Sequence, residues 1–444
     1  MTNKMKTRFA PSPTGFLHVG NIKTAIVAYL YAKKNKGDFI LRSDDTDVKR
    51  DKEEYGEAIV RDLKWLGLNW DAFYKQTDRL SLYEEAKQKL IASGRIYPCY
   101  ESSGDLKVMI KSMEARGVPP IYDRRALKLH PDQIAEYEKA GVKPYYRFLL
   151  EDKDVMWVDE VKGAVKYRGR NFSDPVVFRD NGMPMYTFAS VVDDVDMEIT
   201  HIIRGGDHVT NTAIQIQIFE ALGAKIPQFA HMSLIKSSEG KISKRIGGFA
   251  IKDFRENSIE AMSIINCFAY LGTGKEEVDS TWEELIENFN IGSFGKASTN
   301  FTRADLERIN EKYLHNSTFK NIKPRLKEIG FDDVNEEFWD VAKHNIIKLP
   351  NISQWIDVCK KDFEVRINED DVEFLKITGK YLPDEINAET WKVWINDIKA
   401  NTERKGKSLF MPLRKALTGY EHGPELKLFL KFIGREEILR RLGV

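Results

Sequence analysis

The hydrophobic positions near the N-terminus predict a strand, a helix and a second strand. Thr7–Ala10 has the pattern of a short strand, which Pro11 interrupts. From Asn21 onward, apolar residues recur at the spacing of a helix: Ile22, Ile26, Tyr29 and Leu30. Asp38–Arg42 then has the pattern of a second strand. This order is the βαβ unit of doubly wound parallel sheets, so we expect an α/β fold.

The segment from about residue 98 to 190 has a different pattern. Val155–Val158 and Ala164–Tyr167 are short strand patterns on either side of a glycine. Asp180-Asn-Gly182 is a hairpin signal between two further apolar runs, Val176–Phe178 and Met185–Phe188, which we expect to be strands. We therefore expect an inserted α+β subdomain.

Strands and helices alternate again after this insertion. Strand patterns at Ile199–Arg204 and near Phe229–Ile235 flank a helical pattern at Asn211–Leu222, and the pattern beyond about residue 300 is helical. The expected parts are a Rossmann-like domain split over 1–97 and 191–235, the insertion over 98–190, a connecting region over 236–300 and an all-α region over 301–444.

Composition narrows the class of protein. The chain has 444 residues, of which 42% are hydrophobic and 31% charged, as in globular proteins of several domains. No apolar run approaches the roughly 18 residues of a membrane span, and the first fifteen residues lack a secretory signal, so we expect a cytoplasmic protein without membrane contact. The net charge of +1 does not by itself indicate nucleic-acid binding.

The first candidate motif is His18-Val-Gly-Asn21, where the first strand meets the first helix. Helix N-termini bind anions through free N–H groups, Gly20 allows close approach of a nucleotide, and His18 can donate to a phosphate oxygen. A single histidine near a turn is more often a surface or core residue, so this motif alone is weak.

A second candidate motif is Lys241-Ile-Ser-Lys-Arg245, which follows a predicted strand and turn. Its three cations could neutralise the charge that develops on a triphosphate during displacement at the α-phosphorus. Taken alone, an exposed basic loop is the better interpretation.

Together the two motifs, 223 residues apart between His18 and Lys241, resemble the HIGH and KMSKS motifs of class I aminoacyl-tRNA synthetases. Five further segments resemble the bacterial-type glutamyl-tRNA synthetases among them: Arg8-Phe-Ala-Pro-Ser-Pro-Thr-Gly15, Leu41-Arg-Ser-Asp-Asp-Thr-Asp47, Ile202-Ile-Arg-Gly-Gly-Asp207, Leu409-Phe-Met-Pro-Leu-Arg-Lys-Ala-Leu-Thr-Gly419 and Glu421-His-Gly-Pro424. The resemblance spans nearly the whole chain.

The resemblance implies a glutamate site that uses two arginines, Arg8 and Arg204, to hold the two carboxylates of the substrate. In the family an arginine and a tyrosine, here Tyr186, read the side-chain carboxylate. Asp44 matches a glutamate that holds the ammonium group. Ser12 matches a contact serine, and Ser190 stands where the family usually has asparagine.

The resemblance also implies an ATP site and a reaction. The expected ATP-binding residues are His18, Gly20, Asn21, Lys241, Ser243, Lys244 and Arg245, with His18, Lys241 and Lys244 as the catalytic residues and Mg²⁺ as the cation. The implied activity is the ATP-dependent ligation of L-glutamate to tRNA(Glu), with tRNA(Gln) as a further candidate, by a monomer whose helical region binds the anticodon.

Some relatives carry a zinc knuckle in the insertion. Here Cys99 remains, but Glu101 and Ala126 stand at two of the ligand positions. One thiol does not make a four-ligand zinc site, so we expect no zinc.

Three other classes of protein share parts of this sequence pattern. A nucleotidyltransferase of another class does not need the long helical C-terminal region. A truncated paralogue that glutamylates a modified tRNA base lacks that region. A non-catalytic tRNA-binding protein does not need the two retained motifs.

Overall fold

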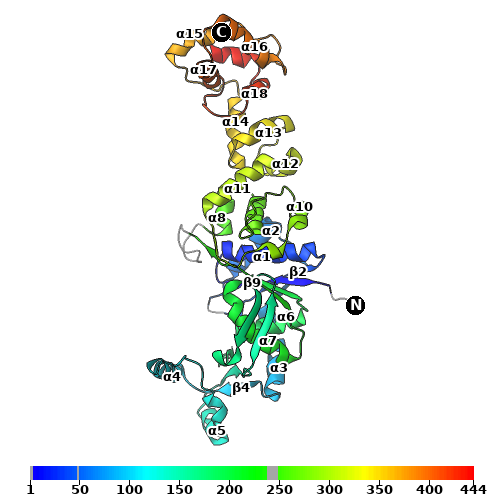
Figure 1. The fold of residues 1–444 in the computed structure, drawn as a ribbon, viewed down its shortest axis with the longest axis vertical. Coiled ribbons are helices and arrows are strands. Elements are labelled where there is room, and N and C mark those ends of the chain that lie inside the picture. Colours follow the sequence, from blue (N-terminus) through cyan, green and yellow to red (C-terminus); the bar gives the residue numbers. More distant parts are fainter. Residues whose placement is uncertain (1–3, 48–49, 238–248) are drawn as a thin grey trace. The chain divides into compact units, whose positions relative to one another are not determined.

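The computed structural model describes residues 4–47, 50–237 and 249–444. The chain forms two compact units (Figure 1). The first comprises Met1–Asn257 and Ile264–Thr302, and the second comprises Ser258–Ser263 and Arg303–Val444.

The first unit is built on a seven-stranded sheet with the strand order β3-β2-β1-β9-β10-β6-β7. All neighbouring strands are parallel except the β6–β7 hairpin. The strands are β1 (Lys6–Phe9), β2 (Asp38–Ser43), β3 (Ala72–Lys75), β6 (Asp154–Asp159), β7 (Gly163–Arg168), β9 (His201–Gly205) and β10 (Gln228–Met232). The strand order reverses between β1 and β9, and doubly wound sheets bind ligands at the carboxyl edge of such a point.

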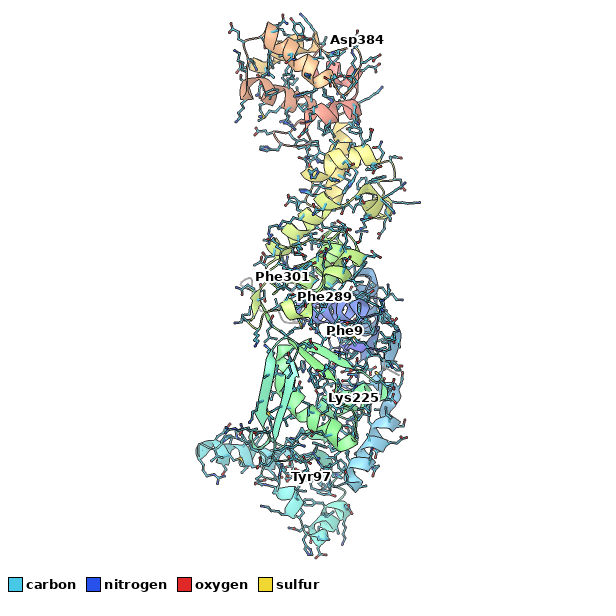
Figure 2. The ribbon with its side chains drawn as sticks, turned by 45° about the vertical axis from the view of Figure 1, so that its right-hand side comes forward. Phe9, Tyr97, Lys225, Phe289, Phe301 and Asp384 are labelled. Atoms are coloured by element: carbon cyan, nitrogen blue, oxygen red, sulfur yellow. The ribbon has the colours of Figure 1, made fainter. Side chains whose placement is uncertain are left out.

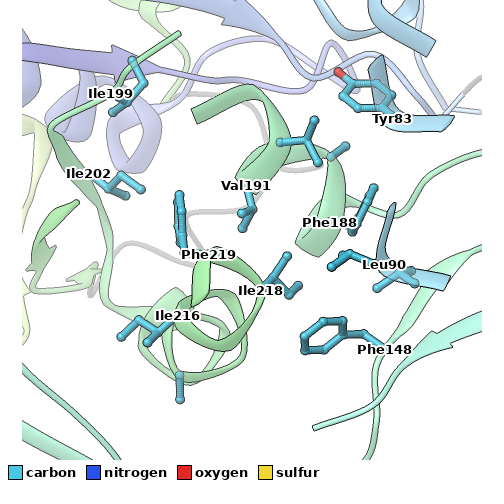
Figure 3. Close-up of a cluster of buried hydrophobic side chains, with 14 of the residues drawn as sticks. Tyr83, Leu90, Phe148, Phe188, Val191, Ile199, Ile202, Ile216, Ile218 and Phe219 are labelled. Atoms are coloured by element: carbon cyan, nitrogen blue, oxygen red, sulfur yellow. The ribbon is translucent and has the colours of Figure 1, made fainter. Parts of the chain in front are cut away.

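The two faces of this sheet are covered by different helices. Helix α1 (Val19–Lys34) packs on β1, β2 and β9, and the Thr7 hydroxyl donates to the Ala28 carbonyl of this helix at 2.9 Å. Helices α3 (Leu80–Ala92), α6 (Tyr186–Asp196) and α7 (Val209–Leu222) pack together on the other face. Figure 3 shows the apolar cluster there, with Phe188 and Val191 of α6 beside Ile218 and Phe219 of α7. The expected α/β fold is therefore confirmed.

A second, antiparallel sheet follows α3. It consists of β4 (Ile96–Cys99), β5 (Tyr145–Phe148) and β8 (Val176–Phe178), with Tyr97 of β4 labelled in Figure 2. Helices α4 (Ser103–Ala115) and α5 (Pro131–Lys139) lie between β4 and β5 in the sequence. The β6–β7 hairpin, although also within 98–190, pairs with β10 in the main sheet.

The predicted strand at Met185–Phe188 is wrong. The turn at Asp180–Gly182 forms, with the Arg179 amide donating to the Met183 carbonyl at 2.9 Å, but helix α6 begins at Tyr186. Four apolar residues do not distinguish a strand from a helix, and the apolar spacing of the complete Tyr186–Asp196 segment is helical.

The remaining elements are mostly helices. Those between residues 50 and 302 are α2 (Glu53–Trp65), α8 (Ile251–Glu256), α9 (Ala261–Tyr270) and α10 (Trp282–Asn288), with the short strands β11 (Ile235–Lys236) and β12 (Thr299–Asn300). The second unit contains α11 (Arg303–Asn316), α12 (Phe319–Glu328), α13 (Glu336–Ala342), α14 (Ile352–Val358), α15 (Glu369–Gly379), α16 (Thr390–Asn401), α17 (Lys407–Thr418), α18 (Leu426–Ile433) and α19 (Arg435–Leu442). Among the described residues, no helix is long and apolar enough to cross a membrane.

Candidate active site

His18 lies at the N-terminus of α1, directly after the loop that follows β1. It is the N-cap residue, and its Nδ1 accepts a hydrogen bond from the Gly20 amide at 3.1 Å. Because Nδ1 accepts, the proton of the neutral ring is on Nε2, which can donate to a ligand. A Cβ at Gly20 would lie 3.0 Å from the ring, so glycine allows the imidazole to fold back over the helix end.

The segment that follows the second motif lies beside His18. The Val19 amide donates to the Phe249 carbonyl at 3.2 Å, and the Ile251 amide donates to Leu17 at 3.0 Å. The predicted ATP-binding residues Lys241, Ser243, Lys244 and Arg245 lie outside the described residues. The described residues that follow the second motif, from Phe249 onward, are therefore held against the first motif by backbone hydrogen bonds.

Three arginines lie on the α6 face of the sheet. Arg8 of β1 is in register with Ile40 of β2, so Arg8 and Arg42 share one face. Thr7 is in register with His201, which places Arg204 of β9 on the same face. All three guanidinium groups are buried, and β1 and β9 are the strands at which the strand order reverses.

Arg8 and Asp44 belong to one chain of buried ion pairs. Arg8 donates from Nε to Asp194 at 3.2 Å, Arg42 donates from Nη1 to Asp194 at 2.9 Å, and the Nε of Arg42 donates to Asp44 at 2.6 Å. Burial raises the pKa of the Asp44 carboxyl to about 6, against the opposing effect of Arg42. Asp44 is therefore ionised at neutral pH.

Arg204 has a different environment. It donates to the hydroxyls of Tyr186 and Thr212 at 3.2 and 2.5 Å and to the Gln215 amide oxygen at 2.7 Å. Within the described part of the chain, no carboxylate forms an ion pair with Arg204, and burial lowers the pKa of its guanidinium. A buried cation without an anion is costly, so the site favours a negatively charged ligand.

The two serines of the predicted site differ in exposure. Ser190 is fully buried, donates to the Tyr186 carbonyl at 2.8 Å and accepts from Gln215 at 2.8 Å. It therefore supports Tyr186 and Gln215. Ser12 is exposed in the loop between β1 and α1. Tyr186 and Ser190 thus lie on α6, and Arg8 and Arg204 form hydrogen bonds with side chains of this helix. Asp44 is linked to α6 through Arg42. Ser12 lies in the loop after β1, and His18 lies where this loop meets α1.

Sequence reasoning missed the residues that support this site. Buried polar side chains without a predicted role hold the arginines in place: Arg42, Asp159, Asp193, Asp194, Thr212, Gln215 and His231. A signal was present, because Tyr186, Ser190 and Asp194 recur every four residues within an apolar helix and share one of its faces.

A cavity of about 790 Å³ adjoins the carboxyl ends of β2 and β3. Its wall comes from the loop after β1, from β2 and β3 and from α2, and it includes Arg42 but neither Arg8 nor Arg204. The cavity is therefore next to the arginine site, without containing its two candidate carboxylate-binding residues.

No group of three or more His, Cys, Asp or Glu side chains in the described segments could hold a metal ion. In the insertion, burial raises the pKa of the Cys99 thiol to about 12, and Glu101 accepts from the Tyr122 hydroxyl at 2.5 Å. The expectation that the chain binds no zinc remains a prediction.

The strand order, the histidine and glycine at the first helix N-terminus and the buried arginines agree with the class of protein that the comparison shows, the class I aminoacyl-tRNA synthetases. Residues 4–308 match the family model "tRNA synthetases class I (E and Q), catalytic domain", and residues 356–444 match "Anticodon binding domain". The chain is 49% identical to the glutamate–tRNA ligase 1 of Rickettsia bellii and 48% identical to that of Rickettsia prowazekii, with 99% of each chain covered in both comparisons.

A solved structure agrees with these sequence matches. The crystal structure of a glutamate tRNA ligase from Elizabethkingia meningosepticum in complex with its amino acid superposes with a TM-score of 0.82 at 25% identity, covering 99% of each chain. The chain belongs to the glutamate–tRNA ligase family of class I aminoacyl-tRNA synthetases.

Proposed function

We propose that the chain ligates L-glutamate to the 3′ end of tRNA(Glu) through a glutamyl-adenylate, with ATP as the energy source. The observation that carries this proposal is the pair of buried arginines, Arg8 and Arg204, on strands β1 and β9 beside the His18 motif. Arg204 has no carboxylate partner in the described segments, which fits a dicarboxylic substrate.

The first step forms the adenylate. A carboxylate oxygen of the substrate's α-carboxyl group attacks the α-phosphorus of ATP, and the bond to the bridging oxygen of pyrophosphate breaks. His18 donates from Nε2 to a phosphate oxygen, and Gly20 and Asn21 line the helix N-terminus where the phosphates bind. Lys241 and Lys244, with Ser243 and Arg245, neutralise the charge that develops on the leaving pyrophosphate.

Mg²⁺ would enter with the phosphates of ATP, where it supplies charge neutralisation. This fits the described side chains, which contain no cluster of three acidic, histidine or cysteine ligands for a resident ion.

The second step transfers glutamate to tRNA. A terminal ribose hydroxyl of the tRNA attacks the carbonyl carbon of the adenylate, an ester bond forms, and AMP leaves with the bonding electrons. Neither step requires a protein nucleophile, so the contribution of the chain is positioning and electrostatic stabilisation.

In the glutamate site, Arg8 and Arg204 take the two carboxylates and Asp44 takes the ammonium group. The Tyr186 hydroxyl accepts from Arg204 Nη1 at 3.2 Å and donates its own proton to the substrate carboxylate. Ser190 holds Tyr186 in place through the helix backbone, and Ser12 contacts the substrate from the loop after β1.

The proposed parts of the chain follow from this reaction. Residues 1–97 and 191–235, together with the β6–β7 hairpin and the start of α6, form the catalytic domain. The rest of 98–190 is the acceptor-end-binding insertion, and 236–300 contacts the tRNA stem. Residues 301–444 bind the anticodon, in agreement with the family match over 356–444. We propose a monomer that acts in the cytoplasm, where ATP and uncharged tRNA are available.

Aminoacylation with purified tRNA isoacceptors tests this proposal. Glutamate should be transferred to tRNA(Glu), and glutamate rather than glutamine should support ATP–pyrophosphate exchange with tRNA present. Parallel reactions with tRNA(Gln) establish whether this second tRNA is also charged. Binding of tRNA without any transfer of glutamate would instead identify a non-catalytic tRNA-binding protein.

A further inference from the structure

Asp194 occupies the centre of the ion-pair chain beneath the proposed glutamate site. Its side chain is 1% exposed, and its Oδ1 accepts from Arg8 Nε at 3.2 Å and from Arg42 Nη1 at 2.9 Å. Its Oδ2 accepts from Arg8 Nη2 at 3.4 Å. Arg42, which is fully buried, in turn holds Asp44. Charges therefore alternate in the order Arg8, Asp194, Arg42, Asp44.

We propose that Asp194 is a positioning residue for glutamate recognition. It orients Arg8 directly and orients Asp44 through Arg42, so that one buried carboxylate aligns the groups for both ends of the substrate. This inference rests on the proposed function, because it assigns roles to Asp194 and Arg42 within the same glutamate site.

The geometry of Arg8 supports this role. Asp194 binds the edge of the guanidinium formed by Nε and Nη2. The other edge of the guanidinium is formed by Nη1 and Nη2. Its Nη1 donates no hydrogen bond to any residue of the described ranges. A guanidinium can bind one carboxylate on each edge, so anchoring the first edge presents the second to the substrate.

The charge of Asp194 also matters. Without it, Arg8 and Arg42 would be two neighbouring buried cations with one fewer anion between them, and their side chains would move apart. A displacement of about 1 Å at a substrate-orienting group reduces a reaction rate by about a hundredfold. Asp194→Asn keeps the size of the side chain and removes its charge.

The adjacent residue Asp193 provides a matched control. It is equally buried on the same helix, but it accepts from Gln76 at 2.8 Å, from Arg79 at 2.7 Å and from Tyr83 at 2.9 Å. Its Oδ2 lies 3.4 Å from Arg42 Nε, whereas the hydrogen bonds of Arg8 within the described ranges go to Asp194. Asp193→Asn therefore removes the same kind of buried charge without releasing Arg8.

The test is ATP–pyrophosphate exchange with tRNA present, measured for the full chain with melting curves alongside. Asp194→Asn should raise the KM for glutamate by about 10- to 100-fold while the KM for ATP changes by less than about threefold. Asp193→Asn should lower the melting temperature with a smaller change in the KM for glutamate. The effects of Arg8→Gln and Asp194→Asn on kcat/KM should be non-additive, because one acts through the other.

If Asp194→Asn does not fold, Asp194→Glu is the second variant, because it keeps the charge and moves Arg8 by one methylene. It should also raise the KM for glutamate, at a melting temperature near that of the wild type. The positioning role would be overturned if the KM for glutamate were unchanged in the folded variant. It would also be overturned if the Asp193 and Asp194 variants raised this KM equally, or if the effects of Arg8→Gln and Asp194→Asn on kcat/KM were additive. Absence of glutamate-dependent exchange in the wild type would overturn the proposed function instead.

Discussion

At the scale of single residues, the two arginines of the site differ in their partners. Arg8 is neutralised by the buried carboxylate of Asp194, whereas Arg204 is held by hydroxyl and amide oxygens. The same residue type therefore has two roles in the folded protein. Arg8 belongs to an existing ion pair, and Arg204 has a charge that the proposed dicarboxylic substrate would balance.

The first prediction follows from this difference. Arg204→Gln should greatly lower kcat/KM for glutamate in the exchange reaction. The melting temperature should change little, because the substitution removes a buried cation that has no anion in the described structure. Exchange kinetics and a melting curve for the same preparation measure both effects. A variant with wild-type glutamate kinetics would exclude Arg204 from the substrate site.

The second prediction concerns the choice between glutamate and glutamine. Arg8→Gln should sharply lower kcat/KM for glutamate, because a fork of two N–H donors favours a carboxylate over an amide. The ratio of kcat/KM for glutamate to that for glutamine should fall by at least about tenfold. Its ion pair with Asp194 also braces β1, so some stability should be lost. Competition kinetics with both amino acids decide the role, and an unchanged ratio would leave Arg8 as a bracing residue.

The third prediction concerns pH. The pKa of Asp44 is about 6 in the folded protein, so kcat/KM for glutamate should fall as the pH is lowered through about 6, when Asp44 gains a proton and loses its attraction for the ammonium group. The folded-state pKa exceeds the ordinary value of 3.8, so protonation between about pH 6 and pH 4 favours the folded state through this group. Protonation of Asp44 should therefore lower kcat/KM for glutamate without unfolding the protein. Asp44→Asn should remove the change in kcat/KM near pH 6.

The fourth prediction concerns Lys244, which lies outside the described residues. Lys244→Ala should raise the barrier to adenylate formation by about 2–4 kcal/mol, because a donor to developing phosphate charge is lost. The KM for glutamate should change little. Exchange at the wild-type rate would show that Lys244 does not stabilise the leaving pyrophosphate.

At the scale of elements, α6 organises the site. Tyr186, Ser190 and Asp194 lie four residues apart on the face that meets the three arginines, while Phe188 and Val191 pack into the apolar cluster of Figure 3. The helix thus anchors itself by apolar burial and carries the polar contacts on its other side. A strand at this position would have placed Phe188 on the same face as Tyr186, Ser190 and Asp194, because residues an even number of positions apart share a strand face.

The antiparallel sheet of the insertion provides the fifth prediction. Glu101 accepts from the hydroxyls of Tyr122 and Tyr145 at 2.5 and 3.1 Å, and Arg147 stacks on the Tyr122 ring at 4.1 Å. These contacts join the elements near Cys99 without a metal. Protein purified without chelators should contain much less than about one zinc ion per chain. Stoichiometric zinc in elemental analysis would contradict this expectation.

At the scale of the whole molecule, the chain combines a class I catalytic domain with a helical unit. The family matches cover residues 4–308 and 356–444, and the relatives from Rickettsia align over nearly the full length. The helical unit has its own core, with Trp339 and Trp394 fully buried. The catalytic-domain match and the anticodon-binding match therefore fall largely in separate compact units.

The sequence by itself determined the class of fold and several elements of its main sheet and the adjoining helices. β1, α1, β2, α7 and β10 were predicted because their local periodicity records which positions are buried. The motif residues His18, Arg8 and Arg204 were also identified from the sequence, since the family resemblance depends on local strings of residues.

The tertiary structure decided the features that depend on distant contacts. Helix α6 replaced a predicted strand, and the β6–β7 hairpin joined the main sheet through β10, because pairing between remote segments is not contained in local spacing. Likewise, Asp194 reaches Arg8 across 186 positions of the chain. Local sequence marked Arg8 and Arg204 equally as cations, and the packing of α6 and α7 determined which of them received a carboxylate partner.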